Sequence, residues 1–294
     1  MLKIKKSDFA TKPKTRAGFD TLFGANRGTK FTEVLFECVN NCLGLTREEF
    51  DVRWRKWRPE DKIHTVRPWV QPTSDALKEK WLETRDPDWL YKHPEYIWDS
   101  LGCSVARSTG ATLGAYNILH RHGFTNPKYI FDWGAGAGLT SLLLAKNFPK
   151  AEVHFSEINE DLIAMFHWFK ERSGLTNIHH VTGPERDDYD LVQALEIIEH
   201  IEWDRRKKVG DPITETMKLL EHTSNDSMFI LCSDFKAELK WTALGHFISY
   251  WVNGKEWPYT HMQKPIEEEL ARRGWKFLEK GFDGIPRIFT KQSE

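Results

Sequence analysis

Two carboxylates and an imidazole are spaced for joint chemistry directly after one apolar run. Glu196, Glu199 and His200 follow residues 189–195, a run that predicts a strand. In a helical turn, positions three and four apart share a face, so the three side chains are expected to converge. Such a set suits a divalent cation such as Mg²⁺, and it equally suits general acid–base work on a hydroxyl group. A plainer alternative is that Glu199 and His200 only hydrogen-bond the following helix.

A glycine-rich turn supplies a second kind of chemistry. Residues 132–138 read Asp-Trp-Gly-Ala-Gly-Ala-Gly between a strand-like run and a helix-like run, and Glu157 ends the next strand-like run. Glycine allows a sharp turn and a close approach of the backbone to a ligand. An acid after the second strand can accept hydrogen bonds from ribose hydroxyls. This order predicts a site for a nucleoside cofactor, although a glycine turn alone is common in loops.

Alternating strand-like and helix-like segments must position these residues. Strands are predicted at 129–131, 153–156, 178–181, 189–195, 227–232, 275–282 and 287–290, and helices at 109–121, 139–147, 161–173 and 265–273. The turn Asp283-Gly284-Ile285-Pro286 favours an antiparallel hairpin between the last two runs. We therefore expect an α/β fold with a doubly wound, Rossmann-like sheet that ends in a hairpin. The carboxyl ends of its strands would carry the site.

The spacing of the glycines separates two classes of cofactor. A dinucleotide fingerprint requires Gly-x-Gly-x-x-Gly or Ala. Its last position would be Leu139 when counted from Gly134, and Ser141 when counted from Gly136. NAD is therefore the weaker alternative.

The strand, turn and acid resemble motif I and its surroundings in the class I S-adenosylmethionine-dependent methyltransferases. The resemblance covers about residues 108–294 and implies the methyltransferase form of the Rossmann-like sheet. It places Asp132 near the methionine amino group and Glu157 on the ribose. The other cofactor-binding residues that it implies are Gly134, Gly136, Gly138, Ala194 and Leu195.

The segment 195–200 resembles the Leu-Glu-x-x-Glu-His motif of two methyltransferase groups. These are the ubiquinone-biosynthesis O-methyltransferases and the small-RNA 3′-terminal 2′-O-methyltransferases. The resemblance implies that Glu196, Glu199 and His200 are catalytic. It also implies that these three, with His261 in the stretch Thr260-His261 before Lys264-Pro265, bind a metal ion beside the acceptor oxygen.

The acceptor is expected to be a hydroxyl oxygen of a small molecule. No Asp/Asn-Pro-Pro-Tyr/Phe sequence, typical of enzymes that methylate amino groups of nucleic acids, follows the fourth strand. No Pro-Cys pair offers a nucleophile for cytosine.

The first 107 residues predict a helical, Trp-rich region that serves as substrate-binding region or lid in front of the methyltransferase domain 108–294. Helices are predicted at 31–43, 47–57 and 75–84. The basic terminus and Arg-Trp-Arg-Lys-Trp-Arg at 53–58 would suit a nucleic acid, which makes a nucleic-acid methyltransferase the alternative. The same pattern also describes an amphipathic helix with buried Trp and solvated cations.

Bulk composition bears on the partners and the compartment of the protein. The formal net charge is −1, so the whole chain does not attract polyanions. The four cysteines form no Cys-x-x-Cys pair, and no apolar stretch approaches the roughly 20 residues that cross a bilayer. A cytoplasmic protein without a membrane partner is expected. A catalytically silent methyltransferase-like subunit is a third interpretation, against which the intact turn and Glu157 argue.

Overall fold

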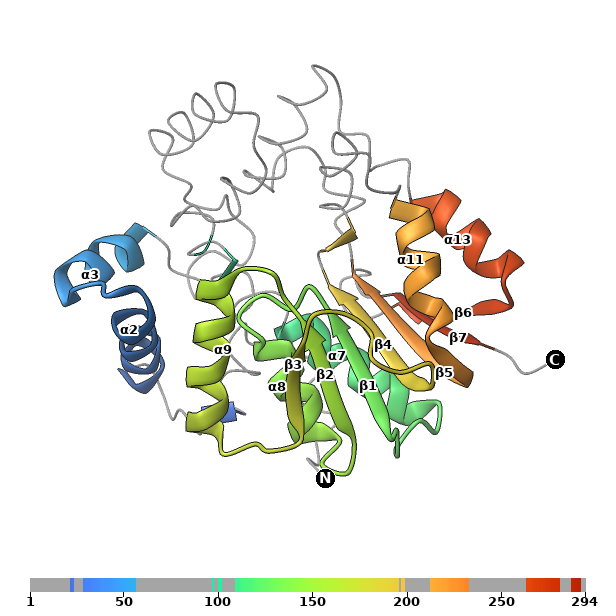
Figure 1. Cartoon of the computed structure of the whole chain (residues 1–294), viewed down its shortest axis with the longest axis horizontal. Coiled ribbons are helices and arrows are strands. Elements are labelled where there is room, and N and C mark those ends of the chain that lie inside the picture. The colour runs from blue at the N-terminus through green and yellow to red at the C-terminus, as the bar shows by residue number, and fades with distance from the viewer. Residues whose placement is uncertain are drawn as a thin grey trace, which may run out of the picture.

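The computed structural model describes residues 22–23, 29–56, 97, 100–101, 109–195, 197–198, 212–232, 263–280 and 287–291. They form one sheet flanked by helices (Figure 1). The strands are β1 (Tyr129–Trp133), β2 (Glu152–Ser156), β3 (Ile178–Val181), β4 (Tyr189–Leu195), β5 (Thr223–Cys232), β6 (Trp275–Lys280) and β7 (Arg287–Lys291). The helices are α2 (Thr29–Leu43), α3 (Arg47–Lys56), α7 (Thr109–Arg121), α8 (Leu139–Asn147), α9 (Glu160–Ser173), α11 (Pro212–Glu221) and α13 (Gln263–Arg272).

The strand order confirms the predicted sheet. It runs β3-β2-β1-β4-β5-β7-β6. Strands β1 to β5 pair in parallel, whereas β7 is antiparallel to both β5 and β6. The chain moves outward from β1 to β3 and then returns to the other side of β1 with β4. The carboxyl ends of β1 and β4 therefore form the point at which such sheets bind ligands.

Alternate residues of each strand serve two hydrophobic layers. Ile130, Val153, Leu191 and Ile230 belong to the first-face cluster, which also contains buried residues of α2, α7, α8 and α9. Phe131, Val192, Phe229 and Phe289 belong to the second-face cluster, with residues of α11 and α13. Both faces of the sheet are thus covered by helices, which confirms the doubly wound arrangement.

The N-terminal region is helical where the structure describes it. Helix α2 packs along α9, with Arg172 of α9 bonded to Glu37 of α2. The ring of Phe23, which precedes α2 in the chain, lies 5.5 Å from that of Phe169 on α9. The predicted helix 75–84 lies outside the described residues, and the proposed boundary at residue 107 stays a prediction. None of the described helices is long and apolar enough to span a membrane.

The largest differences from the prediction concern two elements. Helix α11 was not predicted, although Pro212 at its first position and buried Met217 and Leu220 are helix signals. Strand β5 begins at Thr223 instead of residue 227, and its pairing with β4 is irregular near its start. Asp226 adopts a left-handed conformation there, with φ 63°, which interrupts the strand pattern.

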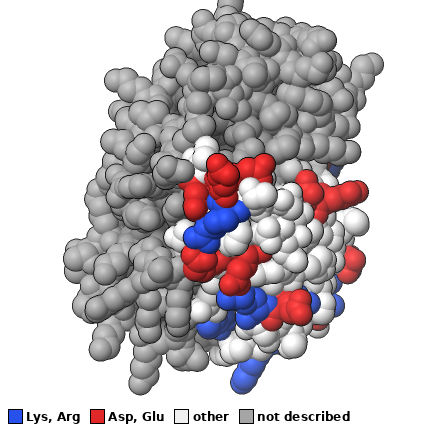
Figure 2. Space-filling model, turned by 90° about the vertical axis from the view of Figure 1, so that its left-hand side faces the viewer, with Lys and Arg blue, Asp and Glu red and all other residues white. Residues whose placement is uncertain are grey.

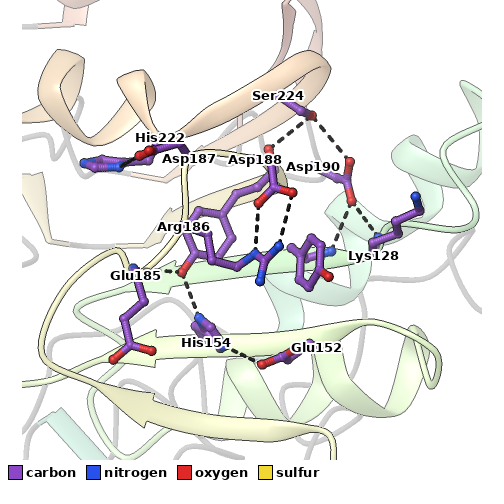
Figure 3. Close-up of polar contacts among 12 residues, drawn as sticks. Lys128, Glu152, His154, Glu185, Arg186, Asp187, Asp188, Asp190, His222 and Ser224 are labelled. Atoms are coloured by element: carbon purple, nitrogen blue, oxygen red, sulfur yellow. Dashed lines mark hydrogen bonds and ion pairs between the residues drawn. The ribbon is translucent and has the colours of Figure 1, made fainter.

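The connection between β3 and β4 contains no helix. Residues 182–188, here called the strap, join two parallel strands that usually need a dozen or more residues and a crossover helix. The strap crosses the second face of the sheet, as Figure 3 shows. There Arg186 bonds to Asp188 at 2.9 Å and lies over the ring of Tyr129.

A chain of hydrogen bonds fastens the strap to the sheet (Figure 3). The Glu185 N–H donates to the Tyr189 hydroxyl at 3.3 Å, and that oxygen lies 2.8 Å from His154 Nδ1. His154 Nε2 lies 2.9 Å from Glu152 Oε1. Burial raises the pKa of the Tyr189 phenol, which therefore stays protonated and can donate to Nδ1. Polar His154 and the exposed His179 beside it explain why no apolar helix among the described residues covers this part of the second face.

Candidate functional site

The glycine turn is left-handed at all three glycines. Gly134, Gly136 and Gly138 have φ values of 63°, 58° and 69°. L-residues with a side chain rarely adopt this conformation, so the sequence of the turn follows from its backbone. Gly138 also begins α8 without a side-chain cap, which leaves the first N–H groups of that helix uncapped at the carboxyl end of β1.

Packing within the protein explains two of these glycines. A Cβ on Gly134 would overlap the side chain of Ile197, and a Cβ on Gly138 would overlap the ring of Phe166. The absence of a Cβ at these positions is therefore required by the chain itself, not only by a ligand. The contact also shows that the segment after β4 lies against the turn.

Glu157 is held at the turn by backbone groups. Its Oε2 accepts a hydrogen bond from the Gly136 N–H at 2.9 Å. Its Oε1 accepts from the N–H groups of Ile158 at 2.8 Å and Asn159 at 2.9 Å, and His180 Nε2 donates to the Glu157 carbonyl at 3.0 Å. A carboxylate oxygen has about two acceptor sites, so Oε1 is filled and Oε2 keeps one. The half-buried carboxylate can therefore accept one further hydroxyl without losing a present bond.

Asp132 lies below the turn with only 1% of its surface exposed. Its Oδ2 accepts hydrogen bonds from Thr140 Oγ1 at 2.9 Å and Ser141 Oγ at 2.6 Å, whereas Oδ1 has no partner. Burial raises the pKa of this carboxyl to about 6, against the opposing effect of Ser141, Gln193 and Thr140. A buried oxygen without a donor is a place where a ligand cation or a water would be stabilised.

Ala194 and Leu195 end β4 beside the turn. Both are buried, and Ala194 pairs with Trp133 of β1 at the point where the strand order reverses. Their predicted contact with a cofactor stays a prediction, but their place in the fold agrees with it.

The predicted catalytic and metal-binding residues Glu196, Glu199, His200 and His261 lie outside the described residues. Ile197, between the first two, contacts the turn through Gly134. Among the residues that the structure does describe, no three His, Cys, Asp or Glu side chains are arranged to hold a metal ion. Nothing described thus supports the cation, and the four roles remain predictions.

Sequence reasoning missed Ile158. This side chain is 79% exposed, directly after Glu157 and before Asn159, whose side chain caps α9. A large apolar side chain so exposed beside a candidate ribose-binding acid offers contact area to a flat apolar group. The signal in the sequence was an apolar residue between an acid and a helix cap.

The described surface of α2, α3 and α9 carries both charges. Figure 2 shows Lys and Arg side by side with Asp and Glu on this side of the molecule. Arg47 pairs with Glu33 at 2.7 Å and with Asp51 at 3.3 Å. The side chains of the Trp–Arg segment 53–58 lie outside the described residues.

Comparisons with known proteins give structural similarity only. No family model and no curated protein matches the sequence. A SAM-dependent methyltransferase from Aquifex aeolicus is similar with a TM-score of 0.43 and 12% identity, over 72% of this chain and 96% of that one. The plantazolicin methyltransferase BpumL, in complex with SAH, gives 0.48 and 14%, over 76% and 100%. The [4+2]-cyclase SpnF gives 0.41 and 15%, over 59% and 60%.

These similarities assign no activity to this chain. The Rossmann-like methyltransferase form of the sheet is recognised from the chain's own strand order and its closing hairpin.

Proposed function

We propose that the protein is an S-adenosylmethionine-dependent methyltransferase that acts on a hydroxyl oxygen of a small molecule. The observation that carries the proposal is the hydrogen bond from the Gly136 N–H to Glu157 Oε2. It joins a left-handed glycine turn after β1 to an acid after β2, at the carboxyl end of the sheet. A plain structural turn requires no acid there.

The described residues fit such a cofactor. Asp132 Oδ1, which is buried and without a partner, would accept from the methionine amino group. Glu157 Oε2 would accept from a ribose hydroxyl with its remaining lone pair. Exposed Ile158 would contact the base. Each of the three parts of the cofactor thus has a chemically suitable group.

The protein would act mainly by positioning. S-adenosylmethionine supplies, when bound, a methyl group activated by its sulfonium. The chain's part is to hold the acceptor oxygen in line with that methyl group, which supplies much of the rate in displacements of this kind. His200, Glu199 or Glu196 would take the hydroxyl proton. The proposal of an oxygen acceptor rests on the Leu-Glu-x-x-Glu-His resemblance and on the lack of Asp/Asn-Pro-Pro-Tyr/Phe.

Calorimetry with S-adenosylhomocysteine tests the cofactor. Glu157→Ala should weaken its binding at least about tenfold, because a charge-assisted hydrogen bond to the ribose is lost. Glu160→Gln, an exposed carboxyl in the first turn of α9, is the matched control and should bind as the wild type does. If the wild-type protein does not bind the ligand, or if Glu157→Ala binds it equally well, the cofactor assignment is wrong.

Incorporation of a labelled methyl group tests the reaction. A cell extract incubated with the protein and labelled cofactor, followed by mass spectrometry, should yield a labelled small molecule with the wild type and none with His200→Ala. Label in RNA or DNA would establish the nucleic-acid alternative, whose binding should fall steeply with salt. Ligand binding without any label would instead indicate the silent subunit.

A further inference from the structure

The floor of the glycine turn contains two buried polar side chains that face each other. Gln193 of β4 pairs in register with Asp132 of β1, so both side chains lie on the first face of the sheet. Gln193 has no exposed surface, and neither its Oε1 nor its Nε2 has a hydrogen-bond partner. The carboxamide nevertheless lies close enough to Asp132 to influence its ionisation. Strands β1 and β4 are adjacent in Figure 1.

Three unpartnered polar atoms thus lie together: Asp132 Oδ1 and both heteroatoms of Gln193. Water-free burial of an unpaired polar group is unfavourable, and an apolar side chain on β4 would avoid it. The other described side chains with a buried unpartnered atom, such as Asn117 and Ser227, lie on other elements. The three atoms of Asp132 and Gln193 lie together at the point where the strand order reverses, which indicates that a polar ligand or a water binds there.

We propose that Gln193 is a positioning residue, which orients Asp132 Oδ1 toward the amino group of the methionine part of the cofactor, directly or through one bound water. The inference rests on the proposed function. With the ligand bound, Gln193 Nε2 would donate to Oδ1, and such a bond would favour the ionised carboxylate that an ammonium group requires. Thr140 and Ser141 hold the other oxygen, Oδ2, so the carboxylate cannot turn away.

No charged side chain competes for Asp132 among the described neighbours. It faces the hydroxyls of Thr140 and Ser141 on α8, Gln193 on β4 and, in register on β2, Phe155. His180 lies one strand further along the same row, and Glu157 is bonded to Gly136 above. A change at Gln193 should therefore reach the ligand through Asp132.

Two ligands separate a role of Gln193 toward the methionine part from a general loss of binding at the site. S-adenosylhomocysteine carries the amino acid part, and 5′-methylthioadenosine lacks it. Gln193→Met, which keeps the length and removes both polar atoms, should bind S-adenosylhomocysteine at least about tenfold more weakly near neutral pH. It should bind 5′-methylthioadenosine within about twofold of the wild type. Ser227→Ala, which removes an unpartnered buried hydroxyl on β5, is the matched control and should leave both affinities unchanged.

The pH dependence supplies a readout that loss of packing would not change. The affinity of Gln193→Met for S-adenosylhomocysteine should rise with pH at a midpoint at least about one pH unit above that of the wild type. Gln193→Glu, which keeps the shape and adds a second acid, should move the midpoint upward as well, and it serves if the first variant does not fold. Both variants are checked by thermal unfolding.

The outcomes distinguish the two proposals. If the wild type binds neither ligand, the proposed function fails. If the wild type binds both and Gln193→Met weakens both equally, weakens neither, or leaves the midpoint unchanged, the role of Gln193 alone is overturned.

Discussion

Replacing Asp132 with asparagine should make the free energy of unfolding less dependent on pH. The carboxyl is buried, and its pKa is raised from 3.8 to about 6. A group whose pKa is higher in the folded state contributes stability that is fully present below its unfolded pKa. That stability is lost as the pH rises through the folded pKa. The amide of the Asp132→Asn variant is neutral at every pH, so the variant does not undergo this loss.

The structure sets the size of the effect. A rise in pKa from 3.8 to about 6 corresponds to about 3 kcal/mol. Some of this change falls at strongly acidic pH, where other groups also titrate. Between about pH 4.5 and pH 7.5, the Asp132→Asn variant should gain about 2 kcal/mol of stability relative to the wild type.

Urea unfolding of both proteins at these two pH values measures the difference. The absolute stabilities matter less than how their difference changes, because the loss of the Thr140 and Ser141 bonding pattern enters equally at both pH values. If the difference in free energy of unfolding between the two proteins stays constant within about 0.5 kcal/mol, the pKa of Asp132 is not raised by burial, and the reasoning is wrong. Binding should change in the opposite sense, since the neutral amide attracts an ammonium group less than the carboxylate does.

Four other substitutions test the packing. Gly138→Ala should lower the free energy of unfolding by more than about 2 kcal/mol, because a left-handed φ is combined with overlap on Phe166. Gly174→Ala, at φ 67° with open space around it, should lower it by only about 1 to 2 kcal/mol in urea unfolding. Tyr189→Phe removes the hydroxyl that links the strap to His154 and should cost about 1 kcal/mol without changing ligand affinity in calorimetry, because it lies at the amino end of its strand. Asn177→Ala should lower the stability by about 1 to 3 kcal/mol, since one amide group donates to the carbonyls of Ala145, Phe148 and Ala151; equal stability of variant and wild type would contradict the three contacts.

Much of the fold was predictable because residues close together in the sequence determine where many of its helices and strands begin and end. Helix α8 begins after Gly138, and β3 and β4 each begin and end on an apolar or aromatic residue, so their bounds agree with the prediction. Helix α11 was missed because its apolar residues are separated by Thr, Glu and Lys, although Gly210 and Asp211 come directly before Pro212.

The site was predictable where a residue's role follows from its position along the chain. Asp132 lies near the carboxyl end of β1 and Glu157 follows β2, and both lie at the turn as expected. The contacts of Gln193 and Ile197 could not be predicted, since they depend on the register between β1 and β4 and on the path after β4. The strap could not be predicted either, because the hydrogen bond between His154 and Tyr189 joins residues far apart in sequence.

The strap also has a consequence for local opening of the sheet. Strand β3 is a four-residue edge strand, and over it the described part of the second face carries the strap where a helix would usually lie. Few buried contacts hold such a strand, so its amides should exchange with solvent before those of β1 and β4. His180 on β3 supports the carbonyl of Glu157. A ligand held by Glu157 should therefore slow amide exchange along β3. Binding at the glycine turn would thus stabilise the edge strand of the sheet against local opening.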